Sequence, residues 1–373
     1  MMDDFFVNKV ILITGAAGTV GQELIRQLLP MSPAAVRALD NSETELFFLG
    51  ERYRGVHGFS IHLGDVRDVR KLEDLCAGVD IIFHAAAFKH VGLSEYHPFD
   101  AVQTNILGVG NVITAALRQG VERVIFTSSD KAVHPTNVMG TTKLIGERLI
   151  TAASLNDLHG RRFSSVRFGN IIGSRGSVIP VFDEQIRRGG PVTVTDANMT
   201  RFFMTKEEAV KLVLEACVMA RGGEVFVTKM PVMRIVDLAQ AMIALLAPAY
   251  GFAPRDIPLQ FVGARSGEKL YEELLTVEEM DQTLEIERMF VVLPSLQNVP
   301  GKINYSYKGL VERASVQHQY ISSEQVPMTV REIKHFLLAH HILGDFIKEP
   351  RTERGLLRHR HLQLVSETRM RLA

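Results

Sequence analysis

The chain has 373 residues, of which 46% are hydrophobic and 23% are charged, and its 42 basic side chains balance its 42 acidic ones. This composition excludes a largely disordered chain, and the absence of net charge argues against nucleic acid as a partner. Two cysteines are too few for a disulfide scaffold, which predicts a reducing compartment, the cytoplasm. We expect neither a signal peptide nor a membrane span, because no stretch has the roughly 18 apolar residues that a span needs.

Short apolar segments alternate with helical segments along the first half of the chain. Strands are predicted at 9–14, 35–39, 59–63, 79–83 and 123–127, and helices at 21–29, 42–53 and about 102–118. Strands separated by helices form parallel sheets, and continuously apolar strands indicate that helices cover both faces. The sequence therefore predicts an α/β fold with a Rossmann-type, doubly wound parallel sheet.

The alternation becomes less regular beyond about residue 162. Further strands are predicted at 163–168, 192–194, 225–227 and 259–262, and helices at 206–220, 235–246 and 329–343. We expect a Rossmann domain that binds a dinucleotide over 1–170 and a smaller, interleaved C-terminal substrate-binding region over 171–297 that covers the edge of the sheet. A C-terminal extension over 298–373 has no predicted role.

Three glycines, Gly15, Gly18 and Gly21, follow the first predicted strand and open the first helix. Glycine permits a tight turn and a close approach of the backbone to a pyrophosphate, which then lies at the helix N-terminus. Asp40 ends the second strand about 20 residues later, where a carboxylate binds ribose hydroxyls and repels a 2′-phosphate. This pattern predicts NAD rather than NADP. The alternatives are a glycine turn without a ligand and an Asp40 that only caps the next helix.

Other residues at strand ends are predicted to contact the same cofactor. A segment after the third strand could hold the adenine, by the same reasoning that places Asp40 at the ribose. Small side chains follow the fourth strand, where a dinucleotide would cross the edge of the sheet. These residues are Asp65, Val66, Ala85, Ala86 and Ala87.

Polar side chains follow the fifth strand in the segment from Thr127 to Lys131, and Lys143 lies in the next helix. Ligands of open parallel sheets bind beyond the carboxyl ends of the strands. A hydroxyl from Ser129, a carboxylate from Asp130 and the amine of Lys131 therefore cluster beside the expected nicotinamide. The alternative is that Asp130 and Lys131 form an ordinary solvated surface pair.

Eight motifs in this order resemble those of the extended short-chain dehydrogenases/reductases. They are TGAAGTVG, GDVRD, HAAAFKHV, TN at 104–105, SSDKAVHPTN, RFGNIIGSRGSVIP, MTRFFMT and RSGEKLYEELL, and they cover about residues 8–295. Within this family the chain is similar to the UDP-N-acetylglucosamine 4,6-dehydratases of bacterial polysaccharide, flagellin-glycan and bacillosamine pathways. The resemblance implies a lyase that uses NAD and a UDP-sugar. The hexose is oxidised at C4, loses water across C5 and C6, and receives the hydride back at C6.

The resemblance also implies a role for each residue of the polar cluster. Lys131, with a lowered pKa, removes the C5 proton, and a protonated Asp130 donates to the departing C6 hydroxyl. Ser129 binds the 4-hydroxyl and Lys143 the nicotinamide ribose. The motifs add Thr19, Val20, Asn41, Asn105 and Thr127 to the cofactor contacts, and Lys89, His90, Asn170, Ser177, Val178, Arg201, Arg265 and Glu268 to the substrate contacts.

Two of these contacts, Arg201 and Arg265, suit a diphosphate because a guanidinium fork matches phosphate oxygens. For Arg265 an ordinary surface salt bridge is an equal alternative, and His90 could equally be a satisfied histidine beside the sheet.

Met139 occupies the position four residues before Lys143 where short-chain dehydrogenases usually have a catalytic Tyr. A thioether cannot accept a proton from an alcohol near neutral pH. A branch of the dehydratases also has Met here, so the resemblance implies an active enzyme in which Asp130, or a water held by Lys143, takes the 4-hydroxyl proton. The alternatives are a 4-epimerase, which normally needs the Tyr, and an NAD-binding regulatory or scaffold module without catalysis.

The sequence leaves the nucleotide and the stereochemistry at C5 open. The nucleotide can be UDP, GDP or dTDP, and C5 can be inverted or retained. No metal site is predicted, because the 13 His residues show no ligand spacing. We expect a homodimer or higher homo-oligomer, paired through the helices near 102–118 and 140–157.

Overall fold

The computed structural model describes residues 2–174, 176–263, 267–295, 303–312, 316 and 318–344. In this part of the chain, one ten-stranded sheet has the strand order β15-β13-β14-β10-β6-β5-β4-β1-β2-β3. Its strands are β1 (Val10–Thr14), β2 (Ala35–Asp40), β3 (Phe59–Leu63), β4 (Ile81–His84), β5 (Arg123–Ser129), β6 (Arg162–Phe168), β10 (Val225–Thr228), β13 (Thr283–Ile286), β14 (Met289–Val292) and β15 (Leu310–Glu312).

The sheet is parallel from β3 to β10 and antiparallel beyond it. The order β3-β2-β1-β4-β5-β6 is that of a dinucleotide-binding Rossmann sheet, and β10 pairs parallel to β6. β14, β13 and β15 then add antiparallel strands. Only two residues separate β13 from β14, so these strands form a hairpin and must run antiparallel. The expected α/β fold is confirmed. The second half of the chain, however, extends the sheet with these strands as well as lying at its edge.

Helices cover both faces of the sheet, and alternate residues of β1 show how. Ile11 and Ile13 belong to the core beneath α2 (Thr19–Leu28) and α10 (Lys206–Met219), whereas Leu12 belongs to the core beneath α4 (Val69–Cys76) and α7 (Gly108–Gln119). All three side chains are fully buried. Burial of each contributes about 1.5–3 kcal/mol, which explains the continuous apolar strands. α1 (Met2–Phe6) packs on α10, and α8 (Val138–Leu155) packs on α7.

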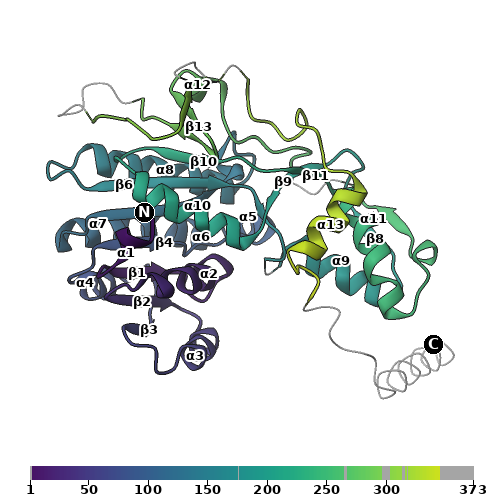
Figure 1. Ribbon diagram of the computed structural model, residues 1–373, viewed down its shortest axis with the longest axis horizontal. Helices are drawn as coiled ribbons and strands as arrows, with labels where there is room; N and C mark the ends of the chain where they lie inside the picture. Colours follow the sequence, from purple (N-terminus) through teal and green to yellow (C-terminus); the bar gives the residue numbers. More distant parts are fainter. Residues whose placement is uncertain are drawn as a thin grey trace.

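A smaller lobe lies beside the large sheet and has its own hydrophobic core. Figure 1 shows it to the right of the sheet, built around α9, α11 and α13. Its core includes Phe182, Leu238 and Leu337, all buried. The lobe and its connections to the sheet comprise β7 (Asn170–Ile171), α9 (Val178–Arg187), β8 (Val192–Val194), β9 (Thr200–Met204), β11 (Val232–Arg234), α11 (Ile235–Leu246), β12 (Leu259–Phe261) and α13 (Val330–Ala339).

Most predicted elements are present with bounds within a few residues, but the helix expected over 102–118 is interrupted. α6 (Pro98–Val102) is followed by a π-helical segment, η2 (Gln103–Leu107), before α7 begins. π-Helical turns occur frequently at functional sites. The remaining short helices are η1 (Leu29–Met31), α3 (Glu43–Arg52), α5 (Val91–Tyr96), η3 (Asp130–Ala132), η4 (Pro248–Tyr250), η5 (Pro254–Asp256) and α12 (Val277–Met280).

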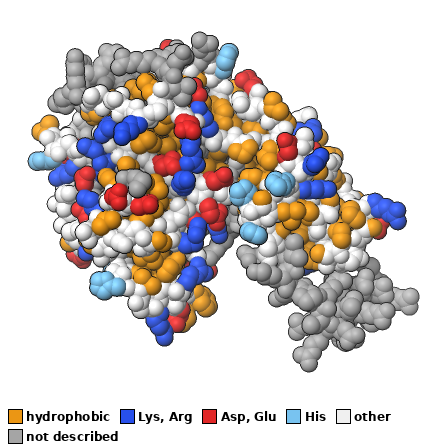
Figure 2. All heavy atoms as spheres, viewed as in Figure 1, with side chains coloured by type: hydrophobic (Ala, Val, Ile, Leu, Met, Phe, Trp, Pro, Cys, Tyr) orange, Lys and Arg blue, Asp and Glu red, His pale blue; other side chains and the backbone are white. Residues whose placement is uncertain are grey.

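The surface matches the neutral composition. On the face drawn in Figure 2, acidic and basic side chains are interspersed among apolar ones rather than separated by sign. Among the residues that the structure describes, no helix has the length and apolarity to cross a membrane.

Candidate functional site

The chain turns sharply between β1 and α2 at the predicted glycine motif. Gly15 has a φ of +68°, and a Cβ at this position would lie 2.6 Å from the backbone nitrogen of Ala86. A Cβ at Gly21 would lie 2.3 Å from the carbonyl oxygen of Gly15. Gly18 is the N-cap residue of α2 and offers no side chain to the first N–H groups of the helix. This turn therefore leaves the helix N-terminus open to an anion, as a pyrophosphate requires.

Asp40 joins the end of β2 to this turn. Its carboxylate accepts hydrogen bonds from the backbone N–H groups of Ala17 and Ser42, both at 3.0 Å. The N-cap residue of α3 is Ser42 and not Asp40. Asp40 therefore has a place beside the glycine turn that helix capping does not explain, and its side chain remains available to a ribose.

Asp65, beyond the end of β3, accepts two hydrogen bonds from the Arg67 guanidinium, at 2.9 and 2.7 Å, and one from the amide of Asn41. The hydrogen bond from Arg67 is the main cause that lowers the pKa of Asp65 to about 2. Asp65 is therefore an anion at neutral pH, in a fixed orientation at the same edge of the sheet.

These elements border a cavity of about 750 Å³ at the carboxyl ends of the parallel strands. Pockets of this size hold ligands as large as a cofactor. Most of the predicted site residues line it: Gly15, Gly18, Thr19, Val20, Gly21, Asp40, Asn41, Asp65, Val66, Ala85, Ala86, Ala87, Lys89, His90, Thr127, Ser129, Lys131, Met139, Lys143 and Asn170.

Residues that the sequence did not single out also line the cavity. They include Phe88, Leu93, Ser94 and Ser174, and Ser128 of the predicted polar segment joins them. The hydroxyls of Ser94 and Ser128 are buried and have no hydrogen-bond partner within the described part of the chain. Buried polar atoms are usually paired, so an unpartnered hydroxyl in a cavity indicates a bound group. Together with the glycine turn and Asp40, this donor set fits a dinucleotide.

Lys143 lies on α8 at the inner end of the cavity, with Met139 one turn before it. Its ammonium donates to the Thr127 carbonyl at 2.9 Å and lies 4.6 Å from the centre of the Phe126 ring. Burial, partly opposed by Glu147, lowers the pKa of Lys143 to about 8. The amine is therefore close to its titration point near neutral pH.

A second feature of α8 is its close approach to η3, the turn that carries the catalytic candidates. A Cβ at Gly140 would lie 2.1 Å from the carbonyl oxygen of Lys131. Asn137 caps α8 by accepting a hydrogen bond from the Gly140 N–H at 2.8 Å. Glycine at this position therefore lets α8 pack closely on η3. Met139 of α8 and Lys131 of η3 consequently line the same cavity.

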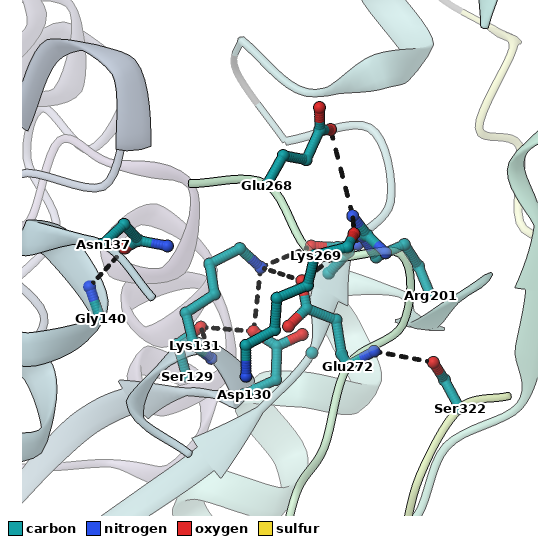
Figure 3. A network of polar contacts seen from close by, with 12 residues as sticks. Ser129, Asp130, Lys131, Asn137, Gly140, Arg201, Glu268, Lys269, Glu272 and Ser322 are labelled. Atoms are coloured by element: carbon teal, nitrogen blue, oxygen red, sulfur yellow. Dashed lines mark hydrogen bonds and ion pairs between the residues drawn. The ribbon is translucent and has the colours of Figure 1, made fainter. Parts of the chain in front are cut away.

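Figure 3 shows the polar cluster around η3. Asp130 is fully buried, and one of its oxygens accepts from the Ser129 hydroxyl at 2.6 Å and from the Lys131 ammonium at 3.0 Å. Its other oxygen is buried and has no partner among the described residues. The Lys131 ammonium also lies 3.4 Å from a carboxylate oxygen of Glu272 and 3.5 Å from the side-chain oxygen of Asn170. The structure thus brings one lysine between two carboxylates.

These neighbours determine the charge of the lysine. Burial by itself lowers the pKa of Lys131, but the carboxylates of Asp130 and Glu272 outweigh burial, and the pKa lies above its ordinary value. Two anions face the amine, so the lowered pKa that its proposed role as a base requires needs a further cause, such as burial under a bound substrate. Burial raises the pKa of Glu272, and Lys131 only partly opposes this effect.

Arg201 holds the segment that carries Glu272. Its guanidinium donates to the carbonyls of Thr200, Lys269 and Leu270, at 2.7, 2.6 and 3.1 Å, and its Nε lies 3.4 Å from Glu272. Arg201 is buried and is not among the residues that line the cavity. Within the described part of the chain, backbone carbonyls and Glu272 are the partners of this guanidinium, and the diphosphate role of Arg201 stays a prediction.

The segment 267–274 also contacts η3 and the residues that follow it at other points. The Lys269 ammonium donates to the Val133 carbonyl at 2.9 Å, and the Asn137 amide donates to the Gly267 carbonyl at 3.1 Å. Glu273 pairs with His134 at 2.7 Å. These contacts fix Glu272 over η3 although the two are far apart in the sequence.

The other predicted residues lie outside the cavity lining. Asp130 lies beneath Lys131, and Asn105 lies behind the wall, where its amide pairs with both backbone polar groups of Phe88 and with Thr142. Ser177 is the N-cap residue of α9 and Val178 begins that helix, and Glu268 lies 4.0 Å from Arg201. Arg265 lies outside the described residues. Among the described residues, no group of His, Cys, Asp or Glu could hold a metal ion.

Glu272 is the residue at the centre of the site that the sequence did not single out. It lies in the motif RSGEKLYEELL, which contains three glutamates, Glu268, Glu272 and Glu273. Their spacing alone does not tell which one faces the lysine, because the segment has no regular structure from which a face could be read.

Comparison with known proteins identifies the family. The family model described as polysaccharide biosynthesis protein matches residues 11–294. A protein of Methanocaldococcus jannaschii called an uncharacterized membrane protein is 46% identical, over 90% of this chain and 98% of its own. UDP-N-acetylglucosamine 4,6-dehydratase (inverting) of Campylobacter jejuni is 35% identical, over 91% of this chain and 99% of its own. The solved structure of Pen from Bacillus thuringiensis is 40% identical and superimposes with a TM-score of 0.82, over 91% and 99% of the two chains.

Other relatives differ in length or in name. Two relatives from Bacillus subtilis and Staphylococcus aureus, 43% and 44% identical, are longer, and the chain spans about half of their length. Rickettsial proteins called UDP-glucose 4-epimerase are 33–34% identical. The match over most of the chain is nevertheless unambiguous. The chain belongs to the polysaccharide biosynthesis protein family, with the Rossmann-type fold of the extended short-chain dehydrogenases/reductases.

Proposed function

We propose that the protein is an NAD-dependent nucleotide-sugar 4,6-dehydratase, a lyase, and that UDP-N-acetylglucosamine is its substrate. The observation that carries this proposal is the ion pair between the fully buried Asp130 and Lys131, whose side chain lines a dinucleotide-sized cavity. Elimination of water needs an acid and a base on one substrate, and adjacent groups of this kind can supply both. The identity to relatives with this printed activity supports the same choice.

The glycine turn would hold the pyrophosphate of NAD, Asp40 the adenosine ribose and Lys143 the nicotinamide ribose. When bound, NAD supplies a reversible hydride acceptor, so that a ketone at C4 makes the C5 proton acidic. The positive charge that Lys143 can carry in a low-dielectric cavity would stabilise negative charge that develops beside it. With a pKa of about 8, Lys143 also reaches its neutral form easily and can pass a proton through a water to solvent.

A single proton transfer within the pair would produce both catalytic groups. Moving the proton of the Lys131 ammonium to Asp130 breaks one N–H bond, forms one O–H bond and leaves the net charge unchanged. The amine can then take the C5 proton, and the carboxylic acid can protonate the departing C6 hydroxyl. The 3.0 Å contact and the unpartnered second oxygen of Asp130 favour this exchange. Exclusion of water by a bound sugar favours it further, because burial disfavours charged forms.

Two other activities compete with this one. A 4-epimerase of the same fold normally uses the Tyr that Met139 replaces, and because it eliminates no water it does not need an acid and a base at C5 and C6 such as Asp130 and Lys131 can supply. A module that binds NAD without catalysis would explain Met139 but leaves the buried Asp130–Lys131 pair without a purpose. We therefore prefer the dehydratase, although proteins called epimerases are also among the relatives.

The test is proton NMR of the purified protein with UDP-N-acetylglucosamine in deuterated water, without an added reductant. A new C6 methyl signal with deuterium at C5 is the expected result, and coupling constants then tell inversion from retention. If no product forms, NAD is added and the assay is repeated with GDP- and dTDP-sugars. A 4-epimer without a methyl signal would point to the epimerase. Bound NAD without turnover of any sugar would point to the binding module.

The variant that tests Lys131 as the base is Lys131→Ala. C5 exchange should stop while NAD still binds, and exchange at the wild-type rate would contradict the role of Lys131 as the base.

A further inference from the structure

Glu272 faces the catalytic pair from a different part of the fold. It lies 141 residues after Lys131, and the contacts of Arg201, Lys269 and Gly267 hold its segment over η3. Its side chain is almost completely buried, and one of its oxygens has no partner among the described residues. Figure 3 shows its carboxylate directed at the Lys131 ammonium, with Arg201 behind it.

The Glu272 carboxylate is buried among other charged groups, unlike a carboxylate in a surface ion pair. Lys131 and Asp130 face it from η3, Arg201 faces it from β9, and Lys269 lies in its own segment. With all of Asp130, Lys131, Arg201 and Glu272 ionised, the four charges cancel. In the proposed mechanism the Lys131 ammonium must lose its proton. A buried carboxylate 3.4 Å away opposes this loss strongly, because little water screens the two charges.

We propose that Glu272 is a positioning residue for the acid–lysine pair: its carboxylate holds the Lys131 ammonium beside Asp130 and sets the range of pH in which the two groups share one proton. This inference rests on the proposed dehydratase function. It assigns a role to a residue that does not line the cavity and acts through Lys131.

The inference predicts a direction for the pH profile. The pair works while Asp130 and Lys131 share one proton, loses activity at high pH when that proton leaves, and loses it at low pH when a second one binds. An anion beside the pair holds protons more tightly and moves both limits to higher pH. A neighbouring charge at this distance shifts a titration by about one to three pH units. Removing the charge should therefore move both limits to lower pH.

The experiment compares the pH profiles of kcat/KM and of C5 hydrogen–deuterium exchange for the wild-type protein and Glu272→Gln. The expected result is a shift of the alkaline limit by about one to three units to lower pH. Glu272→Asp keeps the charge on a shorter side chain, so its alkaline limit should stay near that of the wild type even if kcat falls.

The matched control is Glu273→Gln, which makes the same change one residue away. Glu273 pairs with His134 and Lys269 rather than with Lys131. We expect its profile to keep the wild-type limits.

Two results would overturn the inference. One is a Glu272→Gln profile that is lower at every pH but keeps its limits, since this indicates a structural role alone. The other is an equal shift in Glu273→Gln, which would make the effect general to the segment. If Glu272→Gln does not fold, Glu272→Asp replaces it in the test. This variant keeps the charge, so an alkaline pH limit that moves by about one to three units from the wild-type value would contradict the inference. A wild-type protein that converts no sugar overturns the dehydratase proposal itself, and the inference with it.

Discussion

Lys143 gives the sharpest stability prediction, because the structure buries its amine and the proposed function requires that amine in the cavity. The pKa of about 8 lies below the ordinary value of 10.5 for lysine. Each pKa unit corresponds to about 1.4 kcal/mol, so keeping this side chain charged in the folded protein at pH 7 costs about 3 kcal/mol. Replacing it with Met removes that cost and loses the hydrogen bond to Thr127, which contributes about 1 kcal/mol. We expect Lys143→Met to raise the free energy of unfolding by about 2 kcal/mol at pH 7.

The sign of the pH dependence follows from the same shift. Between pH 8 and 10.5 the unfolded chain binds more protons at Lys143 than the folded protein does, so the stability of the wild type rises with pH in this range. The variant lacks this rise. Its advantage should therefore be complete below pH 8 and should disappear near pH 10.5.

The assay is calorimetry of the cofactor-free protein at pH 7 and pH 10, with NAD affinity and sugar turnover measured in parallel. The melting temperature of Lys143→Met should increase by a few degrees at pH 7 while turnover is lost. A variant that is less stable than the wild type at pH 7, or one with the same advantage at pH 10, would refute the reasoning.

Lys131→Met is the control, because we expect it to change the free energy of unfolding in the opposite direction. Its amine lies between two carboxylates, and its pKa is raised rather than lowered. Removing it should destabilise the protein by about 1–3 kcal/mol, less than for a fully buried pair because 22% of the side chain is exposed.

Three further predictions follow from other parts of the structure. Gly21→Val should abolish NAD binding in calorimetric titration while the fold is kept, because its Cβ would lie 2.3 Å from a backbone oxygen of the turn; unchanged affinity would contradict the cofactor site. Arg167→Met should destabilise the protein by about 3–5 kcal/mol in denaturant unfolding, since it leaves the carboxylates of Glu147 and Glu279 buried without their shared guanidinium; a loss below about 1 kcal/mol would argue against this. Phe99→Glu should dissociate the expected homo-oligomer in light scattering, because this aromatic side chain on α6 is 82% exposed; a monomeric wild type would remove the basis of that expectation.

The features that could be predicted from the sequence are those that depend on residues close together in the chain. The glycine turn, Asp40 at the end of β2 and the run from Ser129 to Lys131 each lie in one strand–turn–helix unit. In such a unit, hydrophobic periodicity and the need for glycine in a tight turn are local properties. The parallel arrangement of the first six strands followed as well, because helices between successive strands connect them by right-handed crossovers.

The charges and contacts at the Asp130–Lys131 pair depend on the tertiary structure. Arg201 faces the acid–lysine pair from β9 and Glu272 from a segment without regular structure, and no periodic pattern tells which glutamate of that segment faces inward. Glu272 adds to the effect of Asp130 in raising the pKa of Lys131, whereas burial and Arg201 lower it, and the Arg201 guanidinium donates to backbone carbonyls. The antiparallel extension by β13 and β14 was likewise beyond the local pattern. Electrostatic effects depend on distance and burial in space, and residues far apart in sequence set both.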